Sequence, residues 1–308
     1  MDDQLLRALQ IRYVKLRFTV SFTGDSILPV HKVSALRGGM GEMLLRANCI
    51  RNRDCGACDF EGECIVRRTM YSKFESKPGY VTSGDSIGYV MECEDYRMRF
   101  PRGGTLSFNL VLFGKTIVYF SQYLQAVSML GMHGIGTRHA KFVVTSVKNT
   151  CSKDILMGND ILMANYQVQT VSDYVWYRMG RLSGTERVLR FRTPATLKYN
   201  GEFLEEFRMD AILNAVKRRI DMLDCFEGIG NDFYRSFQVP VPKVECQRQD
   251  HVKVRRHSSR NGSMCLHGIT GYVEVKEIPT GTLLLLLAGE LIHVGKNTSF
   301  GFGRYEVV

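Results

Sequence analysis

Apolar and polar residues alternate near the start of the chain in the pattern of a strand. Val14, Leu16 and Phe18 are separated by charged or hydroxyl residues, and such a period of two is typical of a half-buried strand. From Val33 to Leu44 the apolar residues recur at steps of three and four, which predicts a helix. Read onward in this way, the pattern predicts strand 14–22, helix 33–44, strands 87–92 and 106–113, helix 117–130 and strand 141–147.

The second half of the chain repeats this order of elements. Its pattern predicts strand 188–192, helix 209–222, strands 238–255 and 264–277, helix 283–291 and strand 304–308. The order β-α-β-β-α-β is the split βαβ arrangement of a ferredoxin-like domain. We expect the boundary between the halves near residues 168–186, and hence one domain over 1–175 and a second over 176–308.

The two halves also end alike. Residues 123–144 and 283–308 each run from a helix through glycines and basic residues into a strand. Duplication within a chain supports a shared fold, although two similar helix–strand units can arise by chance. We therefore expect an α+β protein of two tandem ferredoxin-like, or RRM-like, domains.

The charge of the chain points to a polyanionic partner. Its 308 residues include 41 Lys and Arg against 31 Asp and Glu, a formal net charge of +10. Basic side chains gain affinity for phosphates by releasing counterions, although a positive charge can also serve solubility alone. Basic residues gather again over 253–260, in a segment that either lies on nucleic acid or forms a solvated turn.

No segment predicts a membrane or secreted protein. The longest apolar run, residues 283–287, is far shorter than the roughly 18 residues that cross a bilayer. The first residues lack the basic start and apolar stretch of a secretory signal. We expect a cytoplasmic protein with no membrane partner.

Four cysteines crowd into a short polar insert at residues 48–65. Cys49, Cys55, Cys58 and Cys64 lie within sixteen residues, and four thiolates around a central Cys-x-x-Cys match a structural zinc site. The same ligands can hold an iron–sulfur cluster, and four free thiols on a loop are the bland alternative. A metal here would be structural, since all four ligands come from protein.

A glycine-rich loop over residues 295–304 is the most informative motif. Gly295, Gly301 and Gly303 leave the backbone bare, so main-chain N–H groups can approach phosphate oxygens. Lys296 and Arg304 add positive charge, and neutral donors come from Asn297, Thr298 and Ser299. Alternatively, the glycines serve a tight connection between helix and strand. The basic composition and a similar segment at 131–141 favour the binding interpretation.

This loop and the helix before it resemble the glycine-rich C-terminal motif of the RAMP superfamily. The resemblance is strongest to the CRISPR-associated endoribonucleases that process precursor crRNA (the Cas-six family). Three further stretches fit that family in the right order, residues 34–41, 134–142 and 189–198. The resemblance implies tandem ferredoxin-like domains and an RNA partner, the CRISPR repeat.

The resemblance also implies a chemistry, cleavage without a metal ion. The RNA's own 2′-hydroxyl attacks the adjacent phosphate and leaves a 2′,3′-cyclic phosphate and a 5′-hydroxyl. This reaction needs a general base, and histidine suits the role near neutral pH. Candidates for the base are His31, His293 and His139. Candidate RNA-binding residues are Lys32, Arg37, Arg138, Lys141, Gly295, Lys296, Asn297, Thr298, Ser299, Gly301, Gly303 and Arg304.

Two other functions remain open at this point. A RAMP subunit that holds guide RNA in a CRISPR effector complex without cutting it would share the fold, the glycine loops and the charge. A metal-binding adaptor without an RNA role would share only the cysteine insert. Effector-complex subunits are possible protein partners in the RNA-binding interpretations, and the sequence is also compatible with a homodimer.

Overall fold

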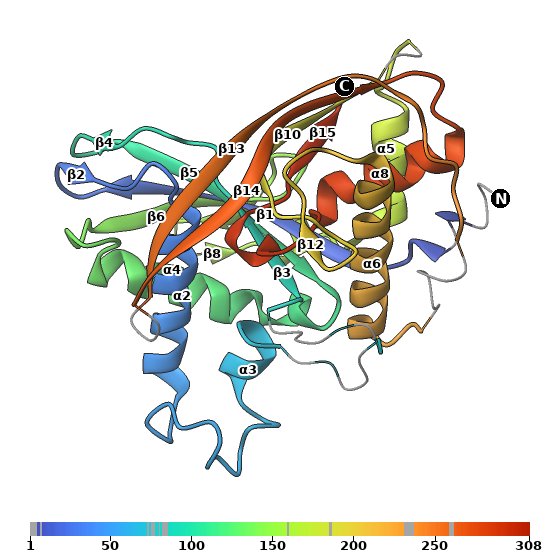
Figure 1. Cartoon of the computed structure of the whole chain (residues 1–308). Coiled ribbons are helices and arrows are strands. Elements are labelled where there is room, and N and C mark those ends of the chain that lie inside the picture. The colour runs from blue at the N-terminus through green and yellow to red at the C-terminus, as the bar shows by residue number, and fades with distance from the viewer. Residues whose placement is uncertain are drawn as a thin grey trace. The chain divides into compact units, whose positions relative to one another are not determined.

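The computed structural model describes residues 5–6, 8–72, 74, 78–79, 81, 86–158, 160–184, 187–230, 237–258 and 262–308 (Figure 1). The chain divides into two compact units. The amino unit comprises residues 13–75 and 82–168, and the carboxyl unit comprises residues 1–12, 76–81 and 169–308. Both units combine helices with antiparallel sheets, which confirms the predicted α+β class.

The amino unit is built around one antiparallel sheet. Its strands lie in the order β3-β5-β1-β6-β7-β8, so the first strand in the chain has the third and fourth long strands as neighbours. Two-residue strands β2 and β4 form a separate ribbon. The elements are β1 (Arg12–Phe22), β2 (Ser26–Ile27), α2 (Val33–Asn48), α3 (Ile65–Thr69), β3 (Tyr89–Glu92), β4 (Arg99–Phe100), β5 (Thr105–Phe113), η1 (Gly114–Tyr119), α4 (Phe120–His133), β6 (Phe142–Lys148), β7 (Asp154–Met157), β8 (Asp160–Ile161) and η2 (Met163–Asn165).

The core of the amino unit forms where one face of this sheet meets the helices. Phe18 on β1 lies opposite Phe108 on β5, and the two rings stack with centroids 5.3 Å apart. Both side chains belong to the same buried cluster as Met40 on α2 and Leu130 on α4. Gly39 faces the Leu130 side chain, where a Cβ would lie only 2.5 Å away. The missing side chain thus lets α2 and α4 approach closely.

The carboxyl unit repeats the strand arrangement. Its sheet has the order β13-β14-β10-β15, in which the first strand again lies between the third and the fourth. Figure 1 shows β13 and β14 as a long hairpin. The elements are β9 (Gln169–Thr170), α5 (Val171–Met179), β10 (Arg187–Ala195), β11 (Lys198–Tyr199), β12 (Glu202–Phe203), α6 (Met209–Glu227), β13 (Val244–Ser258), β14 (Gly262–Val275), α8 (Thr280–Ile292), η3 (Thr298–Phe300) and β15 (Tyr305–Val307).

Helix α8 is the centre of the carboxyl unit. Every residue from Gly281 to Ile292 is buried, as expected of a helix that is apolar on all sides. It packs against α5, α6 and β15. The apolar run 283–287 is therefore a core helix, as its length predicted.

Most predicted elements are present, with shifted bounds. The helix predicted at 117–130 begins as the 3-10 turn η1 and becomes α-helical only at Phe120. The strand predicted at 238–255 begins at Val244. Helix α5 was not predicted, because it lies in the segment that the sequence assigned to the boundary. Within the described residues, no helix is both long and apolar enough to cross a membrane.

Candidate nucleic-acid interface

His31 lies in the turn between β2 and α2 with its side chain exposed. Its ring packs edge-on against Tyr96, with centroids 6.0 Å apart. The protein around the ring, and then the charge of Lys32, lower the pKa of His31 below its ordinary value. More of the imidazole is therefore neutral at neutral pH, and only the neutral ring can accept a proton.

Lys32, predicted to bind RNA, is instead 1% exposed. Its Nζ donates to the carbonyl oxygens of Val30, at 3.3 Å, and Asp95, at 2.5 Å, and lies 5.5 Å from the centroid of the Phe100 ring. Burial lowers the pKa of this ammonium. Because protein encloses the group, the prediction of an RNA contact does not fit its placement. Lys32 instead ties the turn of His31 to the segment that carries Tyr96.

Arg37 lies on α2 and is half-buried. Its Nη2 donates to Ser86 Oγ at 3.0 Å, and its guanidinium lies 5.9 Å from the centroid of the Tyr71 ring. Ser86 Oγ in turn donates to the Met70 carbonyl at 2.6 Å. These contacts join α2 to the chain after α3, which gives Arg37 a structural role.

The glycine segment after α4 folds into a tight turn. Ile135 and Ala140 exchange two backbone hydrogen bonds of 2.9 and 3.0 Å. Gly134 has φ +97°, and a Cβ there would collide with the carbonyl of His139. Within the turn, Gly136 faces the side chain of Leu28, three residues before His31. The fold thus brings two of the predicted segments together in the amino unit.

The predicted polar residues of this turn reach solvent. Arg138, His139 and Lys141 are all exposed. The His139 ring packs edge-on against His133 from the last turn of α4, with centroids 5.5 Å apart. Sequence reasoning missed His133. The only sequence signal for its pairing with His139 was Gly134, a residue type that permits the chain to reverse between the two histidines.

The glycines of the C-terminal loop allow close packing of the backbone. Gly295 has φ +80°, and a Cβ there would lie 2.5 Å from the Thr196 carbonyl oxygen. Gly303 has φ +73°, and a Cβ there would collide with the Val294 carbonyl. The Gly303 N–H already donates to Pro194 at 2.8 Å. At these two positions the tight-connection alternative accounts for the glycines without any phosphate.

The other residues of this loop differ in exposure. Lys296 is exposed, and its Nζ lies 5.5 Å from the centroid of the Phe203 ring. Asn297 is half-buried at the start of η3, and Gly301 closes η3 in the left-handed conformation. Two predicted donors are buried at 8% and 7% exposure, Thr298 and Ser299. Lys296 is therefore the loop side chain best placed for a ligand.

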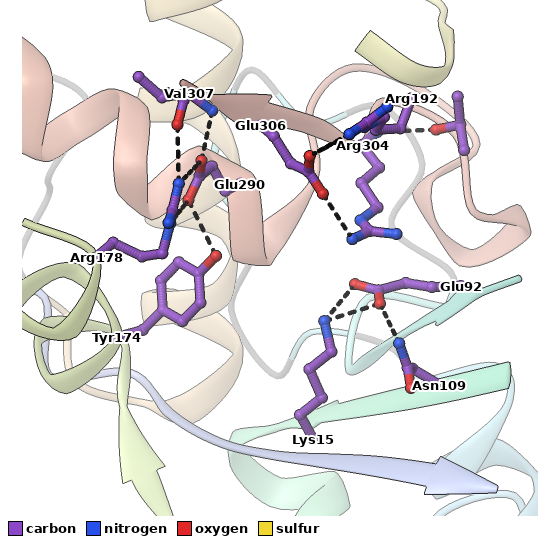
Figure 2. A network of polar contacts seen from close by, with 11 residues as sticks. Lys15, Glu92, Asn109, Tyr174, Arg178, Arg192, Glu290, Arg304, Glu306 and Val307 are labelled. Carbon is purple, nitrogen blue, oxygen red and sulfur yellow. Dashed lines mark hydrogen bonds and ion pairs between the residues drawn. The ribbon is translucent and has the colours of Figure 1, made fainter. Parts of the chain in front are cut away.

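Arg304 is engaged within the protein (Figure 2). Its Nη2 lies 3.2 Å from Glu306 Oε1, and Arg192 holds the other carboxylate oxygen at 2.8 Å. Both arginines and Glu306 are partly exposed. The charge of Arg304 is thus partly neutralised before any phosphate arrives.

A buried carboxylate fixes the strand that follows the loop (Figure 2). Glu290 on α8 accepts hydrogen bonds from Tyr174 at 3.0 Å and from Arg178 at 2.8 and 3.1 Å. It also accepts the Val307 N–H at 2.5 Å. A single side chain thereby joins α5, α8 and β15.

His293 is not placed to act as a base. The side chain is fully buried, and its Nδ1 lies 3.0 Å from the Phe302 carbonyl oxygen. A general base must reach the hydrogen atom that it removes, and a buried ring cannot reach RNA. The prediction for His293 is therefore replaced by a structural role at the end of α8.

The hairpin of β13 and β14 carries basic residues that the sequence only partly indicated. Arg248, Lys253 and Arg255 are exposed on β13, and the Arg256 guanidinium lies 4.4 Å from the centroid of the Phe300 ring. Residues 259–260 of the basic stretch 253–260 lie outside the described residues. In β14, residues 262–268 pair with β13 but not with β10. This part of the hairpin therefore projects from its sheet.

The predicted four-cysteine metal site is not formed. Cys49 directly follows α2 and accepts the Arg53 N–H at 3.2 Å, whereas Cys64 directly precedes α3. In the described parts of the chain, no three or more His, Cys, Asp or Glu side chains gather as a metal would require. Ion pairs organise the insert instead, including Arg53–Glu42 at 2.6 Å. The zinc and iron–sulfur predictions therefore lack support.

Two family models together match most of the chain. Residues 9–173 match one described as an N-terminal domain, AF_1859_N. Residues 189–305 match the CRISPR-associated endoribonuclease Cas6. In addition, an "uncharacterized protein" of Archaeoglobus fulgidus is 22% identical over 289 residues, which are 91% of this chain and 92% of that protein.

Solved structures share the fold. A chain of a partial Cas6-RT-Cas1–Cas2 complex matches 97% of this chain with a TM-score of 0.59 at 10% identity. This chain spans only 46% of that longer one. A Cas6 product complex matches 96% of this chain and 100% of its own, with a TM-score of 0.50 at 11% identity.

Proposed function

We propose that the chain belongs to the Cas6 family of CRISPR-associated RNA-processing proteins, and that it binds CRISPR repeat RNA and cuts precursor crRNA. The observation that carries the proposal is the match of residues 189–305 to the Cas6 endoribonuclease family. An exposed histidine with a lowered pKa, His31, supplies a candidate for the chemistry.

The proposal includes the domain organisation. Six elements of each unit follow the order strand, helix, two strands, helix, strand, with the same relative strand positions in the sheet. They are β1, α2, β3, β5, α4 and β6 in the amino unit, and β10, α6, β13, β14, α8 and β15 in the carboxyl unit. This supports two ferredoxin-like domains of the split βαβ type. The predicted boundary at 175 would cut α5, and the compact units divide after residue 168 instead.

The proposed reaction uses no metal ion and begins with proton removal by His31. A neutral ring nitrogen takes the proton of the ribose 2′-hydroxyl, and the 2′-oxygen attacks the adjacent phosphorus. The bond from phosphorus to the 5′-oxygen breaks, the 5′-oxygen takes a proton from water, and a 2′,3′-cyclic phosphate remains. Positive charge at the phosphorane would lower the barrier. His139 is the alternative base, because it is exposed on the turn that approaches Leu28.

Exposed cations are the proposed contacts to the RNA backbone. In the amino unit these are Arg138 and Lys141, and in the carboxyl unit Lys296 and the basic side chains of β13. Arg304 is a weaker contact, because Glu306 already holds it. Lys32 and His293 are left out of the interface, since both are buried.

The test is cleavage of a CRISPR repeat RNA by purified protein in EDTA. We expect cutting to continue in EDTA and to stop when one 2′-deoxy nucleotide stands at the cut. His31→Ala should slow cleavage about a hundredfold, as expected for a lost general base, with RNA affinity nearly unchanged. His251→Ala is the comparison, an exposed histidine on β13. Because β13 is a proposed RNA contact, this variant is compared at saturating RNA, where its cleavage rate should be normal.

Other outcomes identify the alternatives. Normal cutting by His31→Ala together with slow cutting by His139→Ala would move the base to His139. Tight binding without cutting by the unaltered protein would favour a guide-RNA-holding RAMP subunit. We also propose CRISPR protein partners, because a similar chain is part of a complex named for Cas1 and Cas2.

A further inference from the structure

A pocket in the amino unit lies where three chain segments meet. The ribbon of β2 and β4 supplies two walls, with Ser26 paired to Phe100 and Ile27 to Arg99. The turn after α4 supplies the third. The pocket measures about 540 Å³, within the range of roughly 300 to 1,000 Å³ common for ligand sites. Its lining residues are Asp25, Ser26, Ile27, Arg99, Phe100, Pro101, Arg138 and Ala140.

One side of the pocket is apolar and rigid. Phe100 is 2% exposed, and its ring lies near the Arg97 guanidinium, at 4.9 Å, and Lys32 Nζ, at 5.5 Å. Phe22 packs against the same ring with centroids 4.8 Å apart. These contacts hold the wall in place before any ligand binds, which lowers the entropy that binding costs.

Two arginines from different segments add charge to this pocket. Arg99 and Arg138 are both exposed, and among the described residues neither guanidinium has an ion-pair partner. This distinguishes them from Arg97, which binds Asp95. A guanidinium presents paired N–H donors that match a phosphate, so two of them at one pocket favour a phosphate ligand.

A carboxylate shares the pocket with the arginines. Asp25 lines it, and its Oδ1 accepts the Arg102 N–H at 2.9 Å, which fixes the group. A carboxylate repels phosphate but accepts N–H groups from a base edge. Apolar surface, two guanidiniums and one acceptor together complement a nucleotide whose base carries an N–H donor.

We propose that this pocket binds one unpaired nucleotide of the RNA strand, with its phosphate on Arg99 and Arg138 and its base against Ile27 and Pro101. Asp25 accepts a hydrogen bond from an N–H or amino group of the base. Splayed bases of single strands are the usual targets of sequence-specific RNA recognition. The inference rests on the proposed function, because the nucleotide belongs to the same RNA.

The test combines abasic RNA with pocket variants. Each position of the repeat RNA is made abasic in turn, and the affinity of each RNA for unaltered protein is measured. We expect one position where base removal weakens binding about tenfold, the scale of one lost base contact. In Asp25→Ala protein the same base removal should weaken binding by a smaller factor than in unaltered protein, because one of the contacts of the base is already lost.

The arginine variants test the phosphate contacts. Arg99→Gln and Arg138→Gln should each weaken binding of intact RNA. In these variants, an uncharged methylphosphonate in place of the phosphate of that nucleotide should weaken binding little further. Lys153→Gln is the matched control, since Lys153 is an exposed cation of the amino unit outside the pocket. It should leave the response to abasic and methylphosphonate RNA unchanged.

The failure of this inference differs from the failure of the proposed function. Suppose that the protein binds and cuts repeat RNA, but that at every RNA position base removal weakens binding by the same factor in the pocket variants as in unaltered protein. The pocket then does not hold a nucleotide. If unaltered protein neither binds nor cuts the RNA, the proposed function itself falls.

Discussion

At the scale of single residues, the environment of His31 sets the pH at which it can act as a base. An ordinary histidine has a pKa near 6.5, and the protein surroundings together with Lys32 lower that of His31. Lys32 is fixed by its bonds to Val30 and Asp95. Its charge therefore stays beside the imidazole and disfavours the protonated ring.

The first prediction concerns the pH profile of cleavage. The base works when neutral, so the rate should rise with pH through the pKa of His31 and level off above it. Because this pKa is lowered, half of the plateau rate should be reached below about pH 6.5. Single-turnover rates between pH 4.5 and 8 measure this. A midpoint clearly above 6.5 would assign the base to another group.

At the scale of elements, the glycine loop after α8 is stabilised by backbone packing. Gly303 adopts a positive φ beside the Val294 carbonyl, and its N–H donates to Pro194. A side chain at this position would therefore have to displace the backbone of Val294.

The second prediction compares two glycines. Gly303→Ala should lower the free energy of unfolding by about 3 kcal/mol, from backbone strain and overpacking, as measured by chemical denaturation. Gly38→Ala is the control, because a Cβ at that helical position meets nothing within 4 Å. It should instead stabilise the protein by about 0.5–1 kcal/mol. Equal effects of the two substitutions would contradict the packing argument.

Element periodicity was predictable from the sequence because it depends on which face of a strand or helix is buried. The alternation at Val14, Leu16 and Phe18 corresponds to residues that are all buried on β1. The short β2 and β4 were not predictable, since two-residue strands have no measurable period. Yet this ribbon supplies most of the pocket.

The placement of single polar side chains was less predictable. Lys32 beside a candidate base, and His293 beside a glycine loop, both fit a binding site by spacing alone. Lys32 contacts Asp95, which is distant in the sequence. His293 contacts Phe302, which comes close only through the geometry of the loop between them. The cysteine spacing likewise matched a metal motif, but spacing does not determine whether the thiols converge.

At the scale of the whole molecule, the net charge of +10 is spread over exposed cations of both units. Lys296 is one of these and stands apart from the ion pair of Arg304 and Glu306. Each phosphate contact releases counterions, so RNA affinity should fall steeply as salt rises.

The third prediction is a change in this salt dependence. Lys296→Gln should reduce the slope of log affinity against log salt by about 0.7, the value for one phosphate contact on a single strand. Arg304→Gln should reduce it by less, because Glu306 already neutralises part of the charge. Binding titrations between 50 and 300 mM salt, about the range over which such slopes are measured, decide this. A slope unchanged by Lys296→Gln would place the RNA elsewhere.

The Glu290 cluster also constrains how this protein can diverge over evolution. Loss of Glu290 alone would leave Arg178 beside an empty carboxylate position, and loss of Arg178 alone would strand a buried negative charge; either is costly. Descendants that lose one partner are therefore expected to lose the other as well. In an alignment of homologues, positions 178 and 290 should covary even though 112 residues separate them.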